Sequence, residues 1–140
     1  MIVLDTNIAS VLMAADHPDL PIISQWQQGS ADTDFRISAV TRAEIAYGVA
    51  LLPDGSRRQH LAQAASRFFA AIAELTLPFG IEEADAYGAM MAACRAVGHP
   101  ISVLDAQIAA TARVAGAVVA TRNTQDFMQC GVAVVNPYAS

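Results

Sequence analysis

The chain has 140 residues, of which 54% are hydrophobic and 15% are charged. This length and apolar content predict one folded domain over residues 1–140, because a chain of this size buries roughly two thirds of its surface around one core. The formal net charge is −5, and all eight basic residues are arginine. The lack of lysine excludes reactions that need one, and the acidic balance argues against a wide basic face for nucleic acid.

Targeting signals and paired cysteine motifs are both absent from the sequence. No uncharged apolar stretch approaches the roughly 18 to 20 residues that a membrane span needs, and the first residues carry an aspartate instead of basic side chains. We therefore expect a cytoplasmic protein without membrane contact. Cys94 and Cys130 form no CxxC motif and have no histidine pair at zinc spacing, which predicts two free thiols.

The first elements in chain order alternate between short apolar strands and stretches with helical spacing. A continuous apolar run at 2–4 fits a strand that is buried on both faces. Helical spacing follows at 8–13 and at 22–28, and a polar turn at 29–34 precedes a second strand at 35–38. Thr41 and Glu44 match a capping box that opens the next helix, which the turn at 53–55 ends.

The second half of the chain continues this alternation. An alanine-rich stretch at 56–73 has helical spacing and is expected to pair with the preceding helix as a protruding helical hairpin. The remaining predicted elements are a strand at 75–77, helices at 81–97 and 102–115, a strand at 117–121, a polar turn at 122–126 and a strand at 132–135. Strands and helices that alternate without repeats predict an α/β fold of three layers, with a mostly parallel central sheet flanked by helices.

Acidic residues follow the predicted strands or open the helices next to them. Asp5 comes directly after the first strand, and Glu44 lies in the first helical turn after the second. Asp105 begins a helix, while Asn123 and Asp126 follow the strand at 117–121. Ligands of parallel sheets bind beyond the carboxyl ends of the strands, so these side chains are expected to converge there. Their mutual repulsion is costly unless cations are bound.

An all-oxygen ligand set of this kind suits Mg²⁺ or Mn²⁺, which need only one or two carboxylates directly. Such an ion activates a water molecule and stabilises the charge of a scissile phosphate, so a hydrolytic phosphodiester site is the economical interpretation. Each acid also has a structural alternative: capping for Glu44, a helix-dipole role for Asp105 and a turn role for Asp126. Asp5 fits a purely structural role least well, because an ionisable group after a buried strand needs a partner.

Four sequence blocks, taken together, resemble a PIN-domain ribonuclease. They are IVLDTNI at 2–8, SAVTRAEIAYGV at 38–49, DAQIAATA at 105–112 and ATRNTQDF at 120–127. Their order and spacing are similar to those of the VapC-like toxin branch of bacterial type II toxin–antitoxin systems, including its plasmid-stability and FitB-like members. Any one block is a weak signal, whereas four in register across nearly the whole chain are a strong one.

The resemblance implies a PIN fold, a homodimer, cleavage of RNA that depends on Mg²⁺ or Mn²⁺, and inhibition by a small cognate antitoxin. DNA is then expected to be bound only through the antitoxin. By this analogy Asp5 and Asp105 are direct metal ligands, and Glu44 completes the acidic site and orients water. Many relatives have an acid where this chain has Asn123, so the fourth acidic role passes to Asp126 and Asn123 becomes a polar neighbour.

Further polar residues beside these blocks have two interpretations each. Thr6 and Asn7 either place polar groups beside the metal or cap the first helix. Arg42 and Arg122 either hold phosphate or pair with nearby acids in solvent. The hairpin's apolar side chains form either a groove for an antitoxin helix or ordinary core packing.

The alternative function is a catalytically silent PIN-fold interaction module that acts by binding its partner. A domain freed from catalysis has no reason to keep the four acids together, so the acidic set favours the enzyme. Replacing an acid of this set by its amide is expected to be neutral or stabilising without metal, because the change relieves repulsion.

Overall fold

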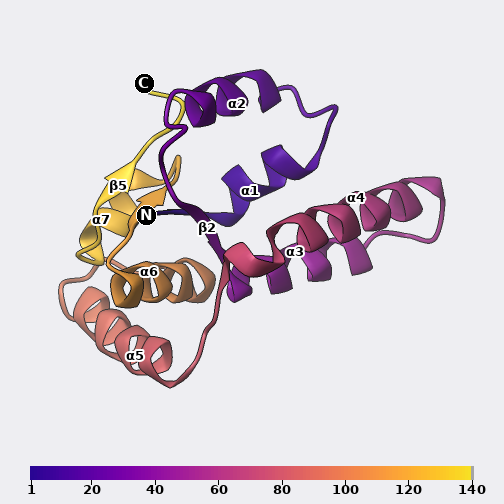
Figure 1. The fold of residues 1–140 in the computed structure, drawn as a ribbon. Coiled ribbons are helices and arrows are strands. Elements are labelled where there is room, and N and C mark those ends of the chain that lie inside the picture. The colour runs from indigo at the N-terminus through magenta and orange to yellow at the C-terminus, as the bar shows by residue number, and fades with distance from the viewer. Residues whose placement is uncertain (140) are drawn as a thin grey trace.

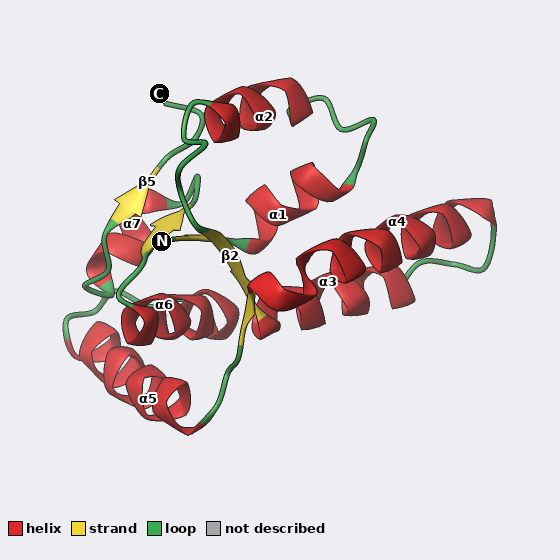
Figure 2. Cartoon of the chain, in the orientation of Figure 1, coloured by secondary structure: helices red, strands yellow, loops and turns green. Residues whose placement is uncertain are grey.

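Five parallel strands form the centre of the structure, a computed structural model that describes residues 1–139. The strands are β1 (Ile2–Leu4), β2 (Phe35–Ser38), β3 (Thr76–Leu77), β4 (Val118–Ala120) and β5 (Val134–Val135), and their order in the sheet is β3-β2-β1-β4-β5. The helices are α1 (Thr6–Met13), α2 (Leu20–Gln28), α3 (Ala39–Ala50), α4 (Ser56–Ile72), α5 (Ile81–Ala96), α6 (Val103–Ala115) and α7 (Thr124–Gln129). A short 3₁₀ turn, Ala73–Leu75, precedes β3. The expected three-layer α/β fold with a parallel sheet is confirmed (Figures 1 and 2).

The sheet separates two hydrophobic cores. Because side chains alternate between the two faces of a strand, Val3 belongs to one core and its neighbour Leu4 to the other. The core around Val3 includes Met90 of α5, Ile108 of α6 and Phe127 of α7. The core around Leu4 includes Ile8 of α1, Ile23 of α2, Ile45 of α3 and Ala65 of α4. Burial of each large side chain contributes about 1.5–3 kcal/mol, so both helical layers are held firmly to the sheet.

The central position of β1 decides which residues meet at the carboxyl edge of the sheet. The register pairs Leu4 with Ile37 of β2 on one side and with Ala120 of β4 on the other. The residues that follow these three strand positions therefore emerge side by side at one edge. They are Asp5, Ser38 and Thr121, and all three are buried.

The helix after β2 begins earlier than the sequence predicts, and its cap is a different residue. Ser38 is the N-cap of α3, because its hydroxyl accepts a hydrogen bond from the N–H of Val40 at 3.1 Å. The predicted capping box of Thr41 and Glu44 is wrong: Thr41 is fully buried and accepts a hydrogen bond from the hydroxyl of Thr6 at 3.2 Å. Glu44 consequently lies in the second turn of α3 and is free of any capping role.

The segment after β4 also differs from its prediction. The expected polar turn at 122–126 is short, because the helix α7 begins within it at Thr124. Phe127 is fully buried and anchors this helix to the core around Val3. The single turn of α7 before this anchor carries Asp126, which therefore has a fixed position instead of a loop's freedom.

The predicted helical hairpin is formed by α3 and α4, which lie side by side and project from the body of the molecule (Figure 1). The guanidinium carbon of Arg42 on α3 lies 4.6 Å from the centre of the Phe69 ring on α4, a cation–π contact that joins the two helices. Phe68, Phe69 and Ile72 pack partly against the core around Leu4, so core packing accounts for much of the hairpin's apolar surface.

The two cysteines are free thiols, as the sequence predicts, and both are buried. Although 36 residues separate Cys94 from Cys130, their sulfur atoms lie 3.6 Å apart.

Among the helices of residues 1–139, none is long and apolar enough to cross a membrane.

Candidate active site

Asp5 has two structural partners at the carboxyl end of β1. One carboxylate oxygen accepts a hydrogen bond from the N–H of Ile8 at 2.9 Å and so caps α1. The other oxygen accepts a hydrogen bond from the hydroxyl of Thr121 at 2.6 Å. Burial raises the pKa of Asp5, these two hydrogen bonds oppose the rise, and the negative charge of Asp105 adds to it. Asp5 is therefore held rigidly in a setting that penalises its charge.

Thr121, which the sequence pattern predicts only as the end of a strand, is also a residue of the site. Its side chain is fully buried, and besides donating to Asp5 it accepts a hydrogen bond from the N–H of Asn123 at 2.9 Å. Thr121 thus connects Asp5 to the segment that carries Asn123 and Asp126. The sequence signal is a polar residue at the end of a buried strand, and the β1–β4 register of the structure places it next to Asp5.

Asp105 lies at the start of α6, where the hydroxyl of Ser102 caps the helix by accepting a hydrogen bond from the N–H of Asp105 at 3.1 Å. Burial raises the pKa of the Asp105 carboxyl most, and the negative charges of Glu44 and Asp126 raise it further. Hydrogen bonds with the side chains of Ser102 and Asn123 lower it in part. Asp105 therefore lies within electrostatic range of both Glu44 and Asp126.

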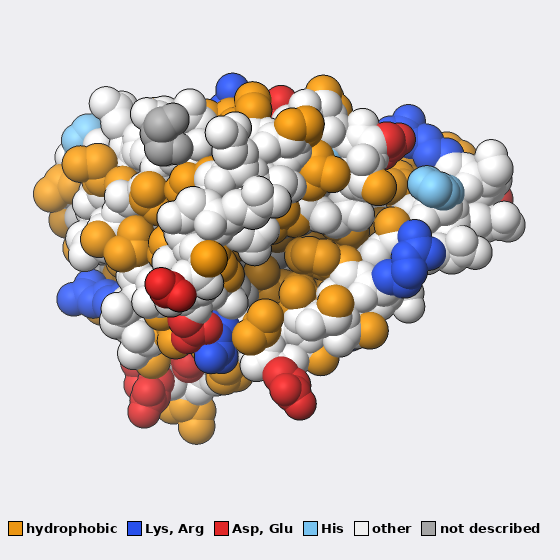
Figure 3. Space-filling model, turned by 45° about the horizontal axis from the view of Figure 1, so that its top comes forward, with side chains coloured by type: hydrophobic (Ala, Val, Ile, Leu, Met, Phe, Trp, Pro, Cys, Tyr) orange, Lys and Arg blue, Asp and Glu red, His pale blue; other side chains and the backbone are white. Residues whose placement is uncertain are grey.

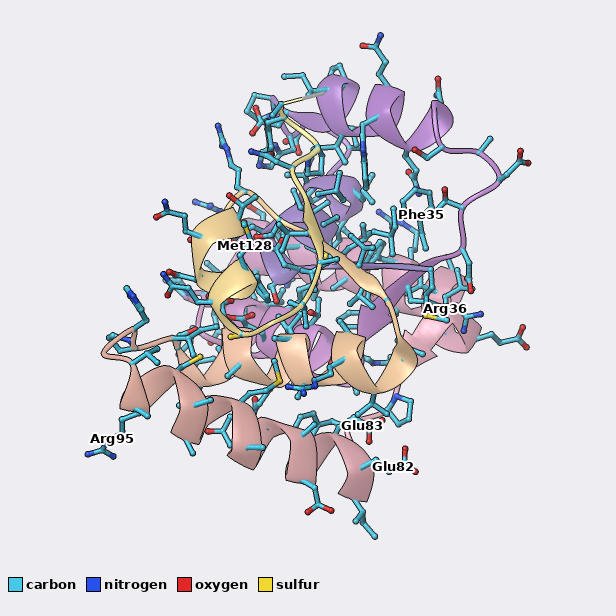
Figure 4. All side chains as sticks on the ribbon, turned by 90° about the vertical axis from the view of Figure 1, so that its left-hand side faces the viewer. Phe35, Arg36, Glu82, Glu83, Arg95 and Met128 are labelled. Carbon is cyan, nitrogen blue, oxygen red and sulfur yellow. The ribbon has the colours of Figure 1, made fainter. Side chains whose placement is uncertain are left out.

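The charge of Asp105 also raises the pKa of Asp5, so Asp105 is the acid that connects Asp5 with Glu44 and Asp126. The structure accordingly brings the four acids into one electrostatic cluster. They come from the end of β1, from α3, from the start of α6 and from α7. Acids elsewhere serve other purposes: Glu82 and Glu83 lie at the far end of α5 (Figure 4), where Glu83 accepts a hydrogen bond from the N–H of Gly80 at 3.1 Å.

Asn123 orients its side chain toward the acids instead of capping α7. Its amide group donates a hydrogen bond to the Asp126 carboxylate at 2.7 Å, and its side chain also hydrogen-bonds to Asp105. As the N-cap residue of α7 it makes no side-chain capping bond. Asn123 therefore links two carboxylates, and its role as a polar neighbour of the site stays a prediction.

The remaining predicted site residues lie around this cluster with different partners. Thr6 is half-buried against Thr41, whereas Asn7 is exposed in the first turn of α1. Arg42 lies over Phe69, and the guanidinium carbon of Arg122 lies 4.0 Å from the centre of the Tyr138 ring. Both arginines thus contact aromatic rings, and neither forms an ion pair with an acid of the site within residues 1–139.

The acids are close enough to interact electrostatically but are not gathered as a closed metal cage. Within residues 1–139, no three or more Asp, Glu, His or Cys side chains lie close enough together to hold one ion. Mg²⁺ retains several waters and takes only one or two carboxylates from the protein. The geometry is therefore compatible with a pair of direct ligands and does not provide a dedicated all-protein site.

Comparison with known protein families shows what kind of domain carries this cluster. Residues 2–130 match the family model described as the PIN domain. The chain belongs to the PIN-domain family. All four acids of the cluster lie within the matched residues, whereas Tyr138, which contacts Arg122, lies beyond them.

Similar proteins resemble this PIN domain over its full length. It is 36% identical to the VapC ribonuclease Y4jK of Sinorhizobium fredii over 139 residues, which cover 99% of this chain and 98% of the relative. It is 34% identical to the toxin FitB of Neisseria gonorrhoeae, with 99% of each chain covered. The crystal structure of FitAcB from Neisseria gonorrhoeae superposes with a TM-score of 0.87 and 33% identity over all of both chains. A structure of FitAB bound to a DNA fragment gives a TM-score of 0.85 at 33% identity, covering 99% of this chain and 96% of that one.

Proposed function

We propose that this PIN-domain protein is a metal-dependent endoribonuclease toxin of a type II toxin–antitoxin module. The observation that carries the proposal is the electrostatic cluster around Asp105, which joins Asp5, Glu44 and Asp126 from distant segments at the carboxyl edge of the sheet. Structural acids are normally dispersed or paired with bases, because like charges repel each other. The similarity to a VapC ribonuclease and to the toxin FitB supports the same conclusion.

The donor set of the cluster fits a hard divalent cation. Burial raises the pKa of Asp5 and of Asp105, and neighbouring carboxylates raise both values further. A positive charge at these two side chains therefore relieves an existing penalty. Their ligand atoms are all oxygen, as Mg²⁺ and Mn²⁺ prefer. We therefore assign these two carboxylates as the direct metal ligands. When bound, the ion supplies a more acidic water molecule and positive charge for the phosphate.

The chain's own residues position and orient the reacting groups. Thr121 and the N–H of Ile8 fix both oxygens of Asp5, which limits the carboxylate's rotation and preorganises the site. Glu44, which has no capping duty, is available to orient the attacking water and to accept its proton. Asn123 and Asp126 complete the cluster on the α7 side, where the amide holds the carboxylate in place.

The partners that we propose are the RNA substrate, a small cognate antitoxin and a second copy of this chain. A DNA-bound relative, FitAB, supports an assembly on DNA, and we assign that contact to the antitoxin because this chain is acidic and has no basic reading element. An antitoxin that inserts a basic residue among the four acids would neutralise the repulsion that a metal otherwise neutralises.

Cleavage of total cellular RNA by the antitoxin-free protein tests the proposal. Reactions with Mg²⁺, with Mn²⁺ and with EDTA are compared with an Asp105→Asn variant that is purified identically, which controls for a contaminating nuclease. We expect discrete products that need the metal and vanish in the variant. Equal cleavage by parent and variant would refute the site, and a folded parent that is inactive with every metal would favour a catalytically silent interaction module.

A further inference from the structure

A hollow lies between α2 and the C-terminal segment. It has a volume of about 460 Å³ and is lined by Ile22, Gln25, Trp26, Gly29 and Ser30 from the α2 region and by Pro137 and Tyr138. A volume of this size is in the range of small-molecule sites, and aromatic walls with a few polar groups are typical of them. In Figure 3, where the α2 side of the molecule comes forward, most charged side chains lie toward the edges of the visible face.

Tyr138 forms a fixed wall of this hollow. Its hydroxyl donates a hydrogen bond to Asp19 at 3.0 Å, and its N–H donates one to the side chain of Asn136 at 3.0 Å. The guanidinium group of Arg122 lies over the ring. A ring that is held at its hydroxyl, at its backbone and at one face has little conformational entropy left to lose when a ligand binds.

The hollow is connected to the acidic cluster through the chain itself. Arg122 is the residue between Thr121, which holds Asp5, and Asn123, which holds Asp126. The pKa of Tyr138 is raised mainly by burial and by the hydrogen bond to Asp19, and the negative charge of Asp5 adds to the rise. The aromatic wall therefore lies within electrostatic range of the carboxylate to which we assign the metal.

We propose that this hollow holds an unpaired nucleobase of the RNA substrate, stacked beside the Arg122–Tyr138 pair. The inference rests on the proposed ribonuclease function and adds a subsite to it. Single-stranded RNA is recognised by stacking of splayed bases on aromatic rings, and the hollow is lined by two such residues, Trp26 and Tyr138, with Arg122 packed over the Tyr138 ring. The side chains of an acidic protein gain little affinity from phosphate contacts, so stacking on aromatic rings is a further source of RNA binding.

Trp26 makes the occupancy of the hollow directly measurable, because it is the only tryptophan in the chain. The experiment uses the full-length Asp105→Asn variant in Mg²⁺, which prevents cleavage, and a pool of single-stranded RNA 12-mers of random sequence. Anisotropy of labelled RNA reports affinity, and Trp26 fluorescence with unlabelled RNA reports contact with the hollow. We expect the RNA to quench Trp26.

Two substitutions in the hollow test the subsite, each with a matched control. Tyr138→Ala is expected to weaken RNA binding by about 5- to 150-fold, which is the range for loss of one stacked base. Tyr138→Phe keeps the aromatic ring, so its affinity for RNA should stay within about twofold of that of the Asp105→Asn background. Ile22→Glu places a negative charge in the hollow at a residue that is 48% exposed and so should leave the fold intact. Ile81→Glu adds the same charge on α5, at a residue that is 84% exposed, and should bind RNA like the background.

The outcomes separate this subsite from the proposed function. Unchanged binding by both Tyr138→Ala and Ile22→Glu, or an absence of Trp26 quenching, would overturn the subsite even where the parent cleaves total RNA. A parent that fails to cleave RNA while the quenching and both variant effects appear would refute the catalytic proposal and leave the subsite standing. If Tyr138→Ala and Ile22→Glu bound RNA normally but no longer bound a purified antitoxin, the hollow would be a peptide site and the inference would be overturned.

Discussion

The hydroxyl of Thr121 donates a hydrogen bond to the carboxylate of Asp5 at 2.6 Å, although 116 residues separate the two in the chain. The pair joins the ends of β1 and β4 at the centre of the sheet, where both side chains are buried. A buried carboxylate without such a donor is costly. The hydrogen bond therefore stabilises the fold and orients a proposed metal ligand at the same time.

We first predict that Thr121→Val destabilises the protein by about 1–3 kcal/mol, because it keeps the side-chain shape and leaves a carboxylate oxygen of Asp5 without its donor. The change should also raise the pKa of Asp5 further, since the lost bond lowers it. Urea unfolding in EDTA measures the stability. Thr121→Ser retains a hydroxyl, so its free energy of unfolding should fall much less. Equal losses of stability in the two variants would show that packing, and not the hydrogen bond, causes the effect.

A second prediction compares amide substitutions at two acids. Asp105→Asn should be neutral or stabilising in EDTA, because it relieves repulsion from Glu44 and Asp126. Asp5→Asn should lower the melting temperature, because both carboxylate oxygens of Asp5 accept hydrogen bonds and an amide has only one acceptor oxygen. Either the Thr121 hydroxyl or the N–H of Ile8 would then face the N–H₂ group. The structure thus revises the sequence-based expectation for Asp5, and thermal melts of the two variants at pH 7 decide between them.

Stability without metal should fall as the pH rises above about 4. The pKa values of Asp5 and Asp105 in the folded state are raised from 3.8, so the folded protein binds more protons than the unfolded chain in the window above that value. Their contribution is greatest on the acidic side and is lost as the pH passes through the raised pKa values. Between pH 4 and pH 8 in EDTA, the melting temperature of Asp105→Asn should depend less on pH than that of the parent protein. Identical slopes for the two proteins would contradict a raised pKa of Asp105.

Glu44→Gln should lower kcat for RNA cleavage by about 100-fold or more and leave the free energy of unfolding nearly unchanged. The first effect follows if Glu44 orients or deprotonates water. The second follows because Ser38, and not Glu44, caps α3. Single-turnover cleavage and urea unfolding of the same preparation test both statements, and a clear loss of stability would restore a structural role for Glu44.

The two neighbouring thiols should react slowly in the folded protein. Burial raises the pKa of Cys130 to about 12, with further contributions from the hydrogen bond to Cys94 and from electrostatic repulsion by Cys94. The Cys130 thiolate is therefore rare at neutral pH. A thiol reagent at pH 8 should therefore label both cysteines rapidly in urea and only slowly without it. Rapid labelling of the native protein would show that α7 opens readily.

Local pattern was enough to predict most elements and the positions of the acids. The apolar run at 2–4 became β1, the alanine-rich stretch became α4, and Asp5 and Asp105 follow the strand and open the helix as expected. These features depend on hydrophobic periodicity and on the rule that ligands lie beyond parallel strands. Helix starts were less predictable, because Ser38 and Thr41 both offer a hydroxyl. Only the tertiary structure, in which the N–H of Val40 bonds to Ser38 and the hydroxyl of Thr6 bonds to Thr41, shows which one caps α3.

The sequence by itself determined which residue types stand at the ends of the strands, and with them an acidic site at the edge of a parallel sheet. Only the tertiary structure decided how those residues are paired. Thr121 meets Asp5 through the β1–β4 register, and Arg122 lies on Tyr138 because the C-terminal segment returns to the site after β5. Contacts between residues this far apart depend on sheet order and helix packing, which periodicity does not encode.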